Sequence, residues 1–261
     1  MPTILFACHA YHSHNPYEGT LRASVELDLC KERAKAGESL PTRDGVGMLV
    51  KDFMTPNPVV VSPETSIQDA LKLMKAHGFG RLPVMSRNKL VGILTEADVM
   101  KVSPSPATTL SVYEINYLIS KVKVSEAMTK NPVTVSPDDT IEYAVLTMRD
   151  HNIGGLPVMD GDKLVGIITE SNVFEALIEM LGFRRAGVRI TLDVPDRIGV
   201  IAHIADLIRQ HGVNIISLAT YKRPGAELSS LVIRIASDDP FPILSSLEKS
   251  GYKVTHVTAS S

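Results

Sequence analysis

Two Thr-x-x-(Asp/Asn) pairs are the residues whose types and spacing best suit ligand binding. Thr95 and Asp98 stand three positions apart where a helix is expected to begin, and Thr169 and Asn172 repeat the arrangement. The unpaired N–H groups of a helix N-terminus suit a phosphate. A threonine adds a hydroxyl donor, and an ionised aspartate accepts at two oxygens, which matches the two hydroxyls of a ribose. The competing interpretation is that both pairs are only helix caps.

The elements that must position these pairs come from an internal repeat. Residues 50–99 align with residues 124–173 at a constant offset of 74, without a gap, and 26 of the 50 aligned pairs are identical. Both copies open with Met-Thr-x-Asn-Pro-Val, continue with Leu-Pro-Val-Met and close with Lys-Leu-Val-Gly-Ile. Two such copies predict a pseudo-twofold unit with two related crevices.

Each copy predicts the same order of elements: strand, helix, strand, strand, helix. In the first copy, a short strand over 59–61 precedes a helix that starts at Ser66 and stops near Gly78. Strands over Leu82–Met85 and Leu90–Leu94 follow, and the last helix begins at the Thr-x-x-Asp pair. The fold class expected for this part of the chain is α+β.

The two copies differ where binding is expected. Asn172 offers one acceptor oxygen and an NH₂ donor, so it cannot accept from two hydroxyls as Asp98 does. Arg81, which can hold a phosphate through two hydrogen bonds, is matched by Gly155. A solvated surface arginine is the alternative. We therefore predict unequal sites, with the Asp98 site tighter.

The two copies resemble CBS domains, named after cystathionine β-synthase, which pair as a Bateman module. The shared opening, the Leu-Pro-Val strand and the Gly-Ile-(Leu/Ile)-Thr-Glu ending carry the resemblance over about residues 48–180. It implies that the Thr-x-x-Asp pattern holds ribose and phosphate of an adenosine compound (AMP, ADP, ATP or S-adenosylmethionine), while backbone near 59–61 and 133–135 reads the adenine edge. The implied nucleotide-binding residues are Val59, Val61, Arg81, Thr95, Asp98, Val133, Val135, Thr169 and Asn172.

A linker separates the copies. Ser103-Pro104-Ser105-Pro106 interrupts regular structure, and the spacing of apolar residues over Leu110–Val122 predicts a connecting helix packed on the pair. The linker resembles that of the acetoin-utilisation B protein family. The domain boundaries expected are 48–103 for the first copy, 104–122 for the linker and 123–180 for the second copy.

The pattern changes over residues 188–261. Alternating strands and two amphipathic helices occur in the order βαββαβ, which predicts a ferredoxin-like unit. The Asp-Arg-x-Gly-Val and Gly-Val-Asn-Ile segments resemble ACT domains, which bind amino acids in many metabolic regulators, usually at a dimer interface. The resemblance implies an amino-acid site at Asp196, Gly199 and Val200, with Asp196 holding the amino group and the helix start the carboxylate. Dimerisation without a ligand is the alternative.

Composition excludes several classes of function. The 27 basic and 29 acidic residues leave no basic surface for nucleic acid or an anionic membrane, and no apolar run is long enough to span a bilayer. Cys8 and Cys30 lie outside the regular repeats, which argues against a disulfide framework and favours a cytoplasmic location. We expect no enzymatic activity, because phosphate-binding glycine loops, zinc spacings and a Gly-x-Ser-x-Gly elbow do not occur.

Residues 1–47 show no period of helix or strand, and we expect a disordered extension or a misassigned start upstream of Met48. Its Cys8, His9, His12 and His14 form a metal-like cluster, but nothing regular fixes their geometry, so we expect no metal site. His77 and His151 occupy equivalent helix ends, where a capping role is favoured over metal binding.

The sequence thus predicts a cytoplasmic, non-catalytic regulatory sensor. The expected ligand is an adenine nucleotide acting as a regulator, with no cofactor, and an amino acid is a second possible ligand. A homodimer and a target enzyme are the expected protein partners. The alternative is a dimeric interaction scaffold that regulates a partner enzyme without a ligand of its own.

Overall fold

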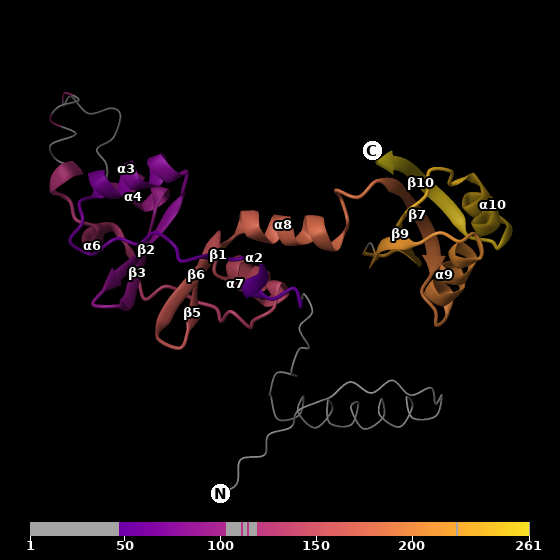
Figure 1. Ribbon diagram of the computed structural model, residues 1–261, viewed down its shortest axis with the longest axis horizontal. Helices are drawn as coiled ribbons and strands as arrows, with labels where there is room; N and C mark the ends of the chain where they lie inside the picture. The colour runs from indigo at the N-terminus through magenta and orange to yellow at the C-terminus, as the bar shows by residue number, and fades with distance from the viewer. Residues whose placement is uncertain (1–46, 103–110, 112–113, 115–118, 223, 261) are drawn as a thin grey trace, which may run out of the picture. The chain divides into compact units, whose positions relative to one another are not determined.

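A computed structural model describes residues 47–102, 111, 114, 119–222 and 224–260 (Figure 1). The metal-like cluster, nearly all of the expected N-terminal extension and most of the linker helix lie outside these residues. Two repeats and a C-terminal unit make up the described part, and each is built as follows.

In the first copy, helix α3 (Ile67–His77) precedes the hairpin of β2 (Arg81–Ser86) and β3 (Lys89–Thr95), and α4 (Glu96–Val102) follows directly. Helix α3 begins where the Ser66 hydroxyl accepts a hydrogen bond from the Asp69 amide at 3.1 Å. It ends at Gly78, whose φ of +68° favours glycine. The predicted helix bounds are confirmed, and Ile67, Ala70 and Met74 on one side of the helix are buried.

The second copy repeats these elements. Helix α7 (Ile141–Asp150) precedes the hairpin of β5 (Gly155–Asp160) and β6 (Lys163–Thr169), and α8 (Glu170–Met180) follows. An apolar core lies beneath the helices of each copy, and the opening segment of the other copy contributes to it. The fully buried members shared by the two cores at repeat-equivalent positions are Val50 and Val124, Ala70 and Ala144, Leu82 and Leu156, Val84 and Val158, and Leu94 and Ile168.

The opening segment of each copy joins the sheet of the other copy. Strand β1 (Thr55–Pro56) pairs with β6, and β4 (Thr129–Lys130) pairs with β3, both antiparallel. The short helices α2 (Val50–Phe53) and α6 (Val124–Ala127) likewise pack against the core of the other copy. The two copies are therefore one structural unit rather than two separable domains.

The strand predicted over 59–61 is wrong, because the chain forms only an isolated parallel bridge between Val61 and Val84. The amide of Val61 donates to the Pro83 carbonyl at 3.1 Å, and its carbonyl accepts from Met85 at 2.9 Å. The preceding hydrogen bond of a parallel ladder would run from an N–H of Pro83 to the Val59 carbonyl, and proline has no N–H. The second copy forms the same single bridge, between Val135 and Val158.

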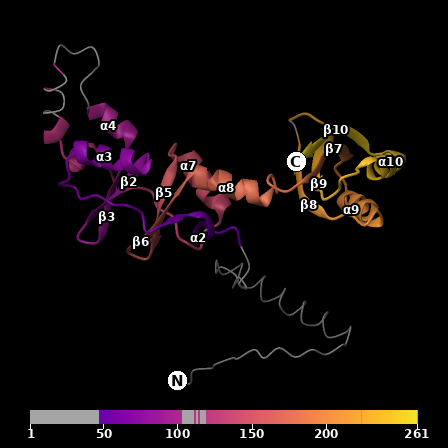
Figure 2. The same cartoon turned by 45° about the horizontal axis from the view of Figure 1, so that its top comes forward.

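The C-terminal unit has the predicted βαββαβ order. Its elements are β7 (Gly187–Pro195), α9 (Val200–Gln210), β8 (Ile215–Tyr221), β9 (Leu228–Ile235), α10 (Phe241–Lys249) and β10 (Lys253–Ser260). The antiparallel sheet has the order β10-β7-β9-β8, and both helices share one apolar core with it (Figure 2). The ferredoxin-like topology is thus confirmed.

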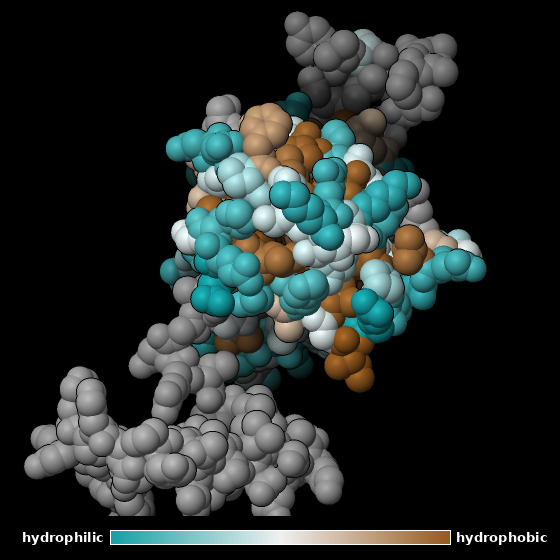
Figure 3. Space-filling view, turned by 90° about the vertical axis from the view of Figure 1, so that its right-hand side faces the viewer, coloured by the Kyte–Doolittle hydropathy of each residue, from teal (hydrophilic) through white to brown (hydrophobic). Residues whose placement is uncertain are grey.

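Hydrophilic side chains predominate on the face shown in Figure 3, where apolar side chains occur singly or in small groups. Such scattered apolar groups are usual on folded proteins. Among the described helices, none combines the length and apolar character that crossing a membrane requires.

Candidate functional site

A crevice of about 530 Å³ opens beside Thr95 and Asp98, and we call it the Asp98 crevice. The start of α4 forms one wall, and the segment after β4 in the second copy, including Pro132 and Val133, forms another. Both copies therefore build this site. Its basic side chains are Arg81, Lys101 and His151.

The Asp98 carboxylate is the buried charged group of this crevice, with 6% of the residue exposed. Its Oδ2 accepts from the Thr95 hydroxyl at 2.7 Å and from the Thr95 amide at 3.1 Å. Its Oδ1 accepts from the Lys101 ammonium at 3.0 Å. Burial alone would raise the pKa of Asp98, but these hydrogen bonds and the charge of Lys101 outweigh it and lower the pKa. The carboxylate is therefore ionised at neutral pH.

A second crevice, of about 430 Å³, is related to the first by the repeat, and we call it the Asn172 crevice. Thr169 and Asn172 lie on one side, and Pro58 and Val59 of the first copy line it as well. The Asn172 Oδ1 accepts from the Thr169 amide at 2.9 Å and from its hydroxyl at 2.7 Å. An amide oxygen has two lone pairs, so both are used by the cap.

The structure brings only some of the implied backbone positions to the crevices. Val59 and Val133 line them, whereas Val61 and Val135 are not among the lining residues. Val61 and Val135 are buried, at 8% and 4% exposed, and their amides and carbonyls are used in the bridges to the neighbouring strands. The amides of these two residues are therefore not available to donate to an adenine edge.

Arg81 lines both crevices. It begins β2 and lies opposite Thr95 in the β2–β3 register. Its guanidinium occupies the space above Gly155, where an added Cβ would come within 2.9 Å of the arginine Cζ. Burial lowers the pKa of Arg81, and attraction to the Glu170 carboxylate partly offsets this. Arginine remains charged under such a shift.

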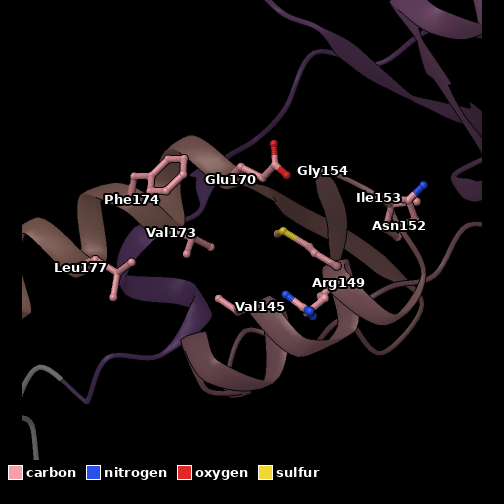
Figure 4. A pocket seen from close by; sticks show the side chains of 10 residues that line it. Val145, Arg149, Asn152, Ile153, Gly154, Glu170, Val173, Phe174 and Leu177 are labelled. Carbon is pink, nitrogen blue, oxygen red and sulfur yellow. The ribbon is translucent and has the colours of Figure 1, made fainter. Parts of the chain in front are cut away.

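A third cavity, of about 650 Å³, lies between α7 and α8 (Figure 4). Its walls are largely apolar and include Val145, Val173 and Phe174, while Glu170 lies at one end beside Gly154. It contains neither Thr-x-x-(Asp/Asn) pair. We therefore do not assign it to the same chemistry as the two crevices.

In the C-terminal unit, Gly199 has a φ of +89° and precedes the first residue of α9. Val200 is 5% exposed and belongs to the apolar core, so only its backbone is placed for a ligand. Asp196 is exposed and forms an ion pair with Lys222 at 3.4 Å. An amino group at Asp196 would therefore compete with Lys222.

Comparison with protein families decides the identity of the repeats. The model of the CBS domain matches residues 50–105 and again residues 124–179. A CBS domain-containing protein of Dictyostelium discoideum is 33% identical over 136 residues, which cover 51% of this chain and 94% of that protein. The chain belongs to the CBS-domain family. Residues 186–258 match the TTHA0829-like ACT domain, so a CBS pair is followed by an ACT-like domain.

Two solved structures similar to this CBS pair carry functional descriptions. The crystal structure of CBSX2 in complex with AMP is 36% identical and covers 51% of this chain and 99% of that chain, with a TM-score of 0.44. A Vibrio cholerae protein with a proposed role in acetoin utilization (AcuB) is 29% identical and covers 52% of this chain and 94% of that chain, with a TM-score of 0.43.

Sequence reasoning missed two basic residues of the Asp98 crevice. Lys101 contacts the Asp98 carboxylate, and His151 lines the crevice as well as ending α7, where its Nδ1 meets the Thr147 carbonyl at 2.9 Å. The sequence repeat could have indicated Lys101, because the equivalent residue of the second copy is Glu175, which carries the opposite charge.

Within the part of the chain that the structure describes, no group of three metal-ligating side chains occurs.

Proposed function

We propose that this CBS pair is a non-catalytic regulatory sensor of adenosine-type nucleotides, with the Asp98 crevice as its main site. The observation that carries the proposal is a buried, ionised carboxylate that borders a crevice with Arg81 and Lys101 on its lining. A carboxylate suits a ribose diol, and the cations suit a phosphate. A volume of about 530 Å³ lies within the usual range of small-molecule sites.

The hydrogen bonds already present limit how a ribose can bind. A carboxylate has about four acceptor positions, and Asp98 uses two with Thr95 and one with Lys101. One ribose hydroxyl can therefore donate to Oδ1 without displacing anything, and the second must compete with the lysine. The helix cap and the ligand site are compatible functions of the same residue.

The Asn172 crevice is proposed as the weaker site. The oxygen of Asn172 is fully used by Thr169, so toward a ribose the side chain can only donate through its NH₂ group. Such a hydrogen bond is neutral and weaker than one to a carboxylate. The two crevices should therefore differ in affinity even for a ligand without a phosphate.

The relatives support a regulatory rather than a catalytic role. The Dictyostelium relative, which the chain covers almost completely, is named only for its CBS domains, and CBSX2 was crystallised with AMP. Binding would change the shape of the module and so its fit to a target enzyme.

We further propose that the ACT-like domain binds an amino acid at Asp196 and the backbone of Gly199 and Val200.

Isothermal titration calorimetry of the full chain with AMP, ATP and S-adenosylmethionine tests the proposal. A guanosine monophosphate titration is the control, since it carries the same phosphate but a different base edge. Saturable binding of at least one adenosine compound, stronger than that of the guanosine control, is expected. Heats no larger than dilution for every adenosine compound would refute nucleotide sensing.

A dimeric scaffold is the second candidate, and one observation favours it. Helices α7 and α8 expose Tyr143, Leu146 and Phe174 to 54%, 57% and 63%. The first copy has Asp69 and Lys72 in place of the tyrosine and leucine. On α7, this exposed apolar surface is confined to the second copy, and it suits contact with the same surface of a second chain.

A further inference from the structure

We propose that Arg81 is one anion-binding side chain shared by the two crevices, so that a phosphate bound in one lowers the affinity of the other for a second phosphate. The inference rests on the proposed function, because it concerns how two nucleotides would bind. It adds a coupling between the sites, which neither the repeat nor the individual crevices require.

The first step is the position of Arg81. The residue lines the Asp98 crevice, where it lies opposite Thr95 across the strand pair. It also lines the Asn172 crevice, next to Phe79 and Gly80 of the same segment. One guanidinium thus borders both sites, although each site has its own Thr-x-x-(Asp/Asn) pair.

The second step is the absence of a repeat-equivalent arginine. Gly155 stands at that position, and the Arg81 guanidinium fills the space that a side chain there would need. A Cβ on Gly155 would come within 2.9 Å of the arginine Cζ. The glycine therefore leaves space for the Arg81 side chain, and a side chain at position 155 would have to displace the guanidinium.

The third step is the unequal supply of other cations. The Asp98 crevice is also lined by Lys101 and His151. Among the described residues that line the Asn172 crevice, Arg81 is the only cationic side chain, and Glu175 replaces the lysine at the repeat-equivalent position. A phosphate in the Asn172 crevice thus depends on Arg81, while one in the Asp98 crevice has alternatives and also attracts Arg81.

The fourth step is the charge near Arg81 when no ligand is bound. The carboxylate of Glu170, at the start of α8, attracts the guanidinium, and it lies beside Gly154 (Figure 4). One guanidinium carries a single positive charge, so two phosphates drawn to it would have to share that charge, and the two crevices compete for it.

The test compares AMP with adenosine, which lacks the phosphate, by calorimetry on the full chain. In the unmodified protein, the second AMP step reports the Asn172 crevice with the first crevice filled. In Asp98→Ala, the remaining AMP site reports the same crevice with its neighbour empty. We expect the second AMP step of the unmodified protein to be roughly tenfold weaker or more, which is the loss of one charge-assisted contact. For adenosine, the two values should agree.

Arg81→Gln, introduced into both the unmodified protein and Asp98→Ala, should remove this difference and weaken AMP, while adenosine binding persists and shows that the fold is intact. Arg87→Gln, at the exposed far end of the same hairpin, removes an equal charge and should change nothing. If the AMP values agree in the unmodified protein and Asp98→Ala, the sharing is overturned although nucleotide sensing stands. If neither AMP nor adenosine binds, the proposed function falls and takes the sharing with it.

Discussion

Replacing Asp98 by alanine gives the sharpest separation between a ligand site and a helix cap. The chain contains a matched control in Asp69, which makes nearly the same contacts: its Oδ2 accepts from the Ser66 hydroxyl at 2.8 Å and its Oδ1 from Lys72 at 3.2 Å. The two aspartates differ in place, because Asp69 is exposed and lies outside both crevices. A capping role alone predicts similar consequences for both substitutions.

The expected magnitude follows from the hydrogen bonds that Asp98 has available. One ribose hydroxyl can donate to Oδ1 without displacing Lys101, and a hydrogen bond to a charged group contributes about 1.5–3 kcal/mol. Asp98→Ala should therefore weaken AMP binding about ten- to hundredfold. The lost cap should cost about 1 kcal/mol of unfolding free energy in addition. Asp69→Ala should leave AMP affinity unchanged.

Calorimetry with AMP and chemical denaturation of the three proteins provide the two measurements. An AMP affinity that is the same in Asp98→Ala and in the unmodified protein would refute the reasoning. Equal losses of affinity in Asp98→Ala and Asp69→Ala would also refute it, because they would trace the effect to helix stability rather than to ligand contact.

Three further predictions concern stability and assembly. Burial would raise the pKa of Asp98, but Thr95 and Lys101 lower it overall, so the stability difference between the unmodified protein and Asp98→Asn should stay constant from pH 7 to about 5. It should shrink only as the pH falls through the lowered pKa, and a decline already above pH 5 in denaturation experiments would contradict this. Gly92→Ala should cost about 1–3 kcal/mol, because its Cβ would lie 2.9 Å from the carbonyl of the first residue of β4. A change within about 0.5 kcal/mol, as for neutral surface substitutions, would show that this packing is loose. Leu146→Lys, which installs the residue of the first copy, should convert a dimer to a monomer in light scattering; an unaltered dimer would exclude the α7–α8 face.

The repeat made most of the fold predictable. Capping residues and glycines such as Ser66 and Gly78 mark helix ends through local chemistry, so their positions could be read from the sequence alone. The βαββαβ order of the C-terminal domain followed from equally local patterns. Each of these features depends on residues close together in the chain.

The exchange of opening segments could not be predicted, because both copies offer the same partner sequence. Strand β1 pairs with Gly166 and Ile167, and the first copy has Gly92 and Ile93 at the equivalent positions. Pairing within a copy and pairing between copies would bring together identical residue types. The choice depends on the path of the whole chain.

The candidate site was predictable in its side chains and less so in its backbone. The types and spacing of Thr95 and Asp98 pointed to one crevice wall, and the structure places a cavity there. The backbone prediction included Val61, whose amide is hydrogen-bonded in the bridge to Val84. The sequence of an extended segment does not reveal which of its backbone groups are already hydrogen-bonded within the protein. The mismatch between Arg81 and Gly155 was visible, but only the structure shows that one residue fills the space left by the other.

The reciprocal exchange of β1 and β4 carries a consequence for how such a protein could originate. A chain holding one copy alone would leave its opening strand without a partner and the edge of its sheet uncovered. Two such chains could satisfy each other by the same exchange, as in domain-swapped dimers. Fusing the two genes would preserve every contact while making the exchange intramolecular. After fusion, the halves no longer had to remain identical, and substitutions such as arginine against glycine at one equivalent position could become fixed.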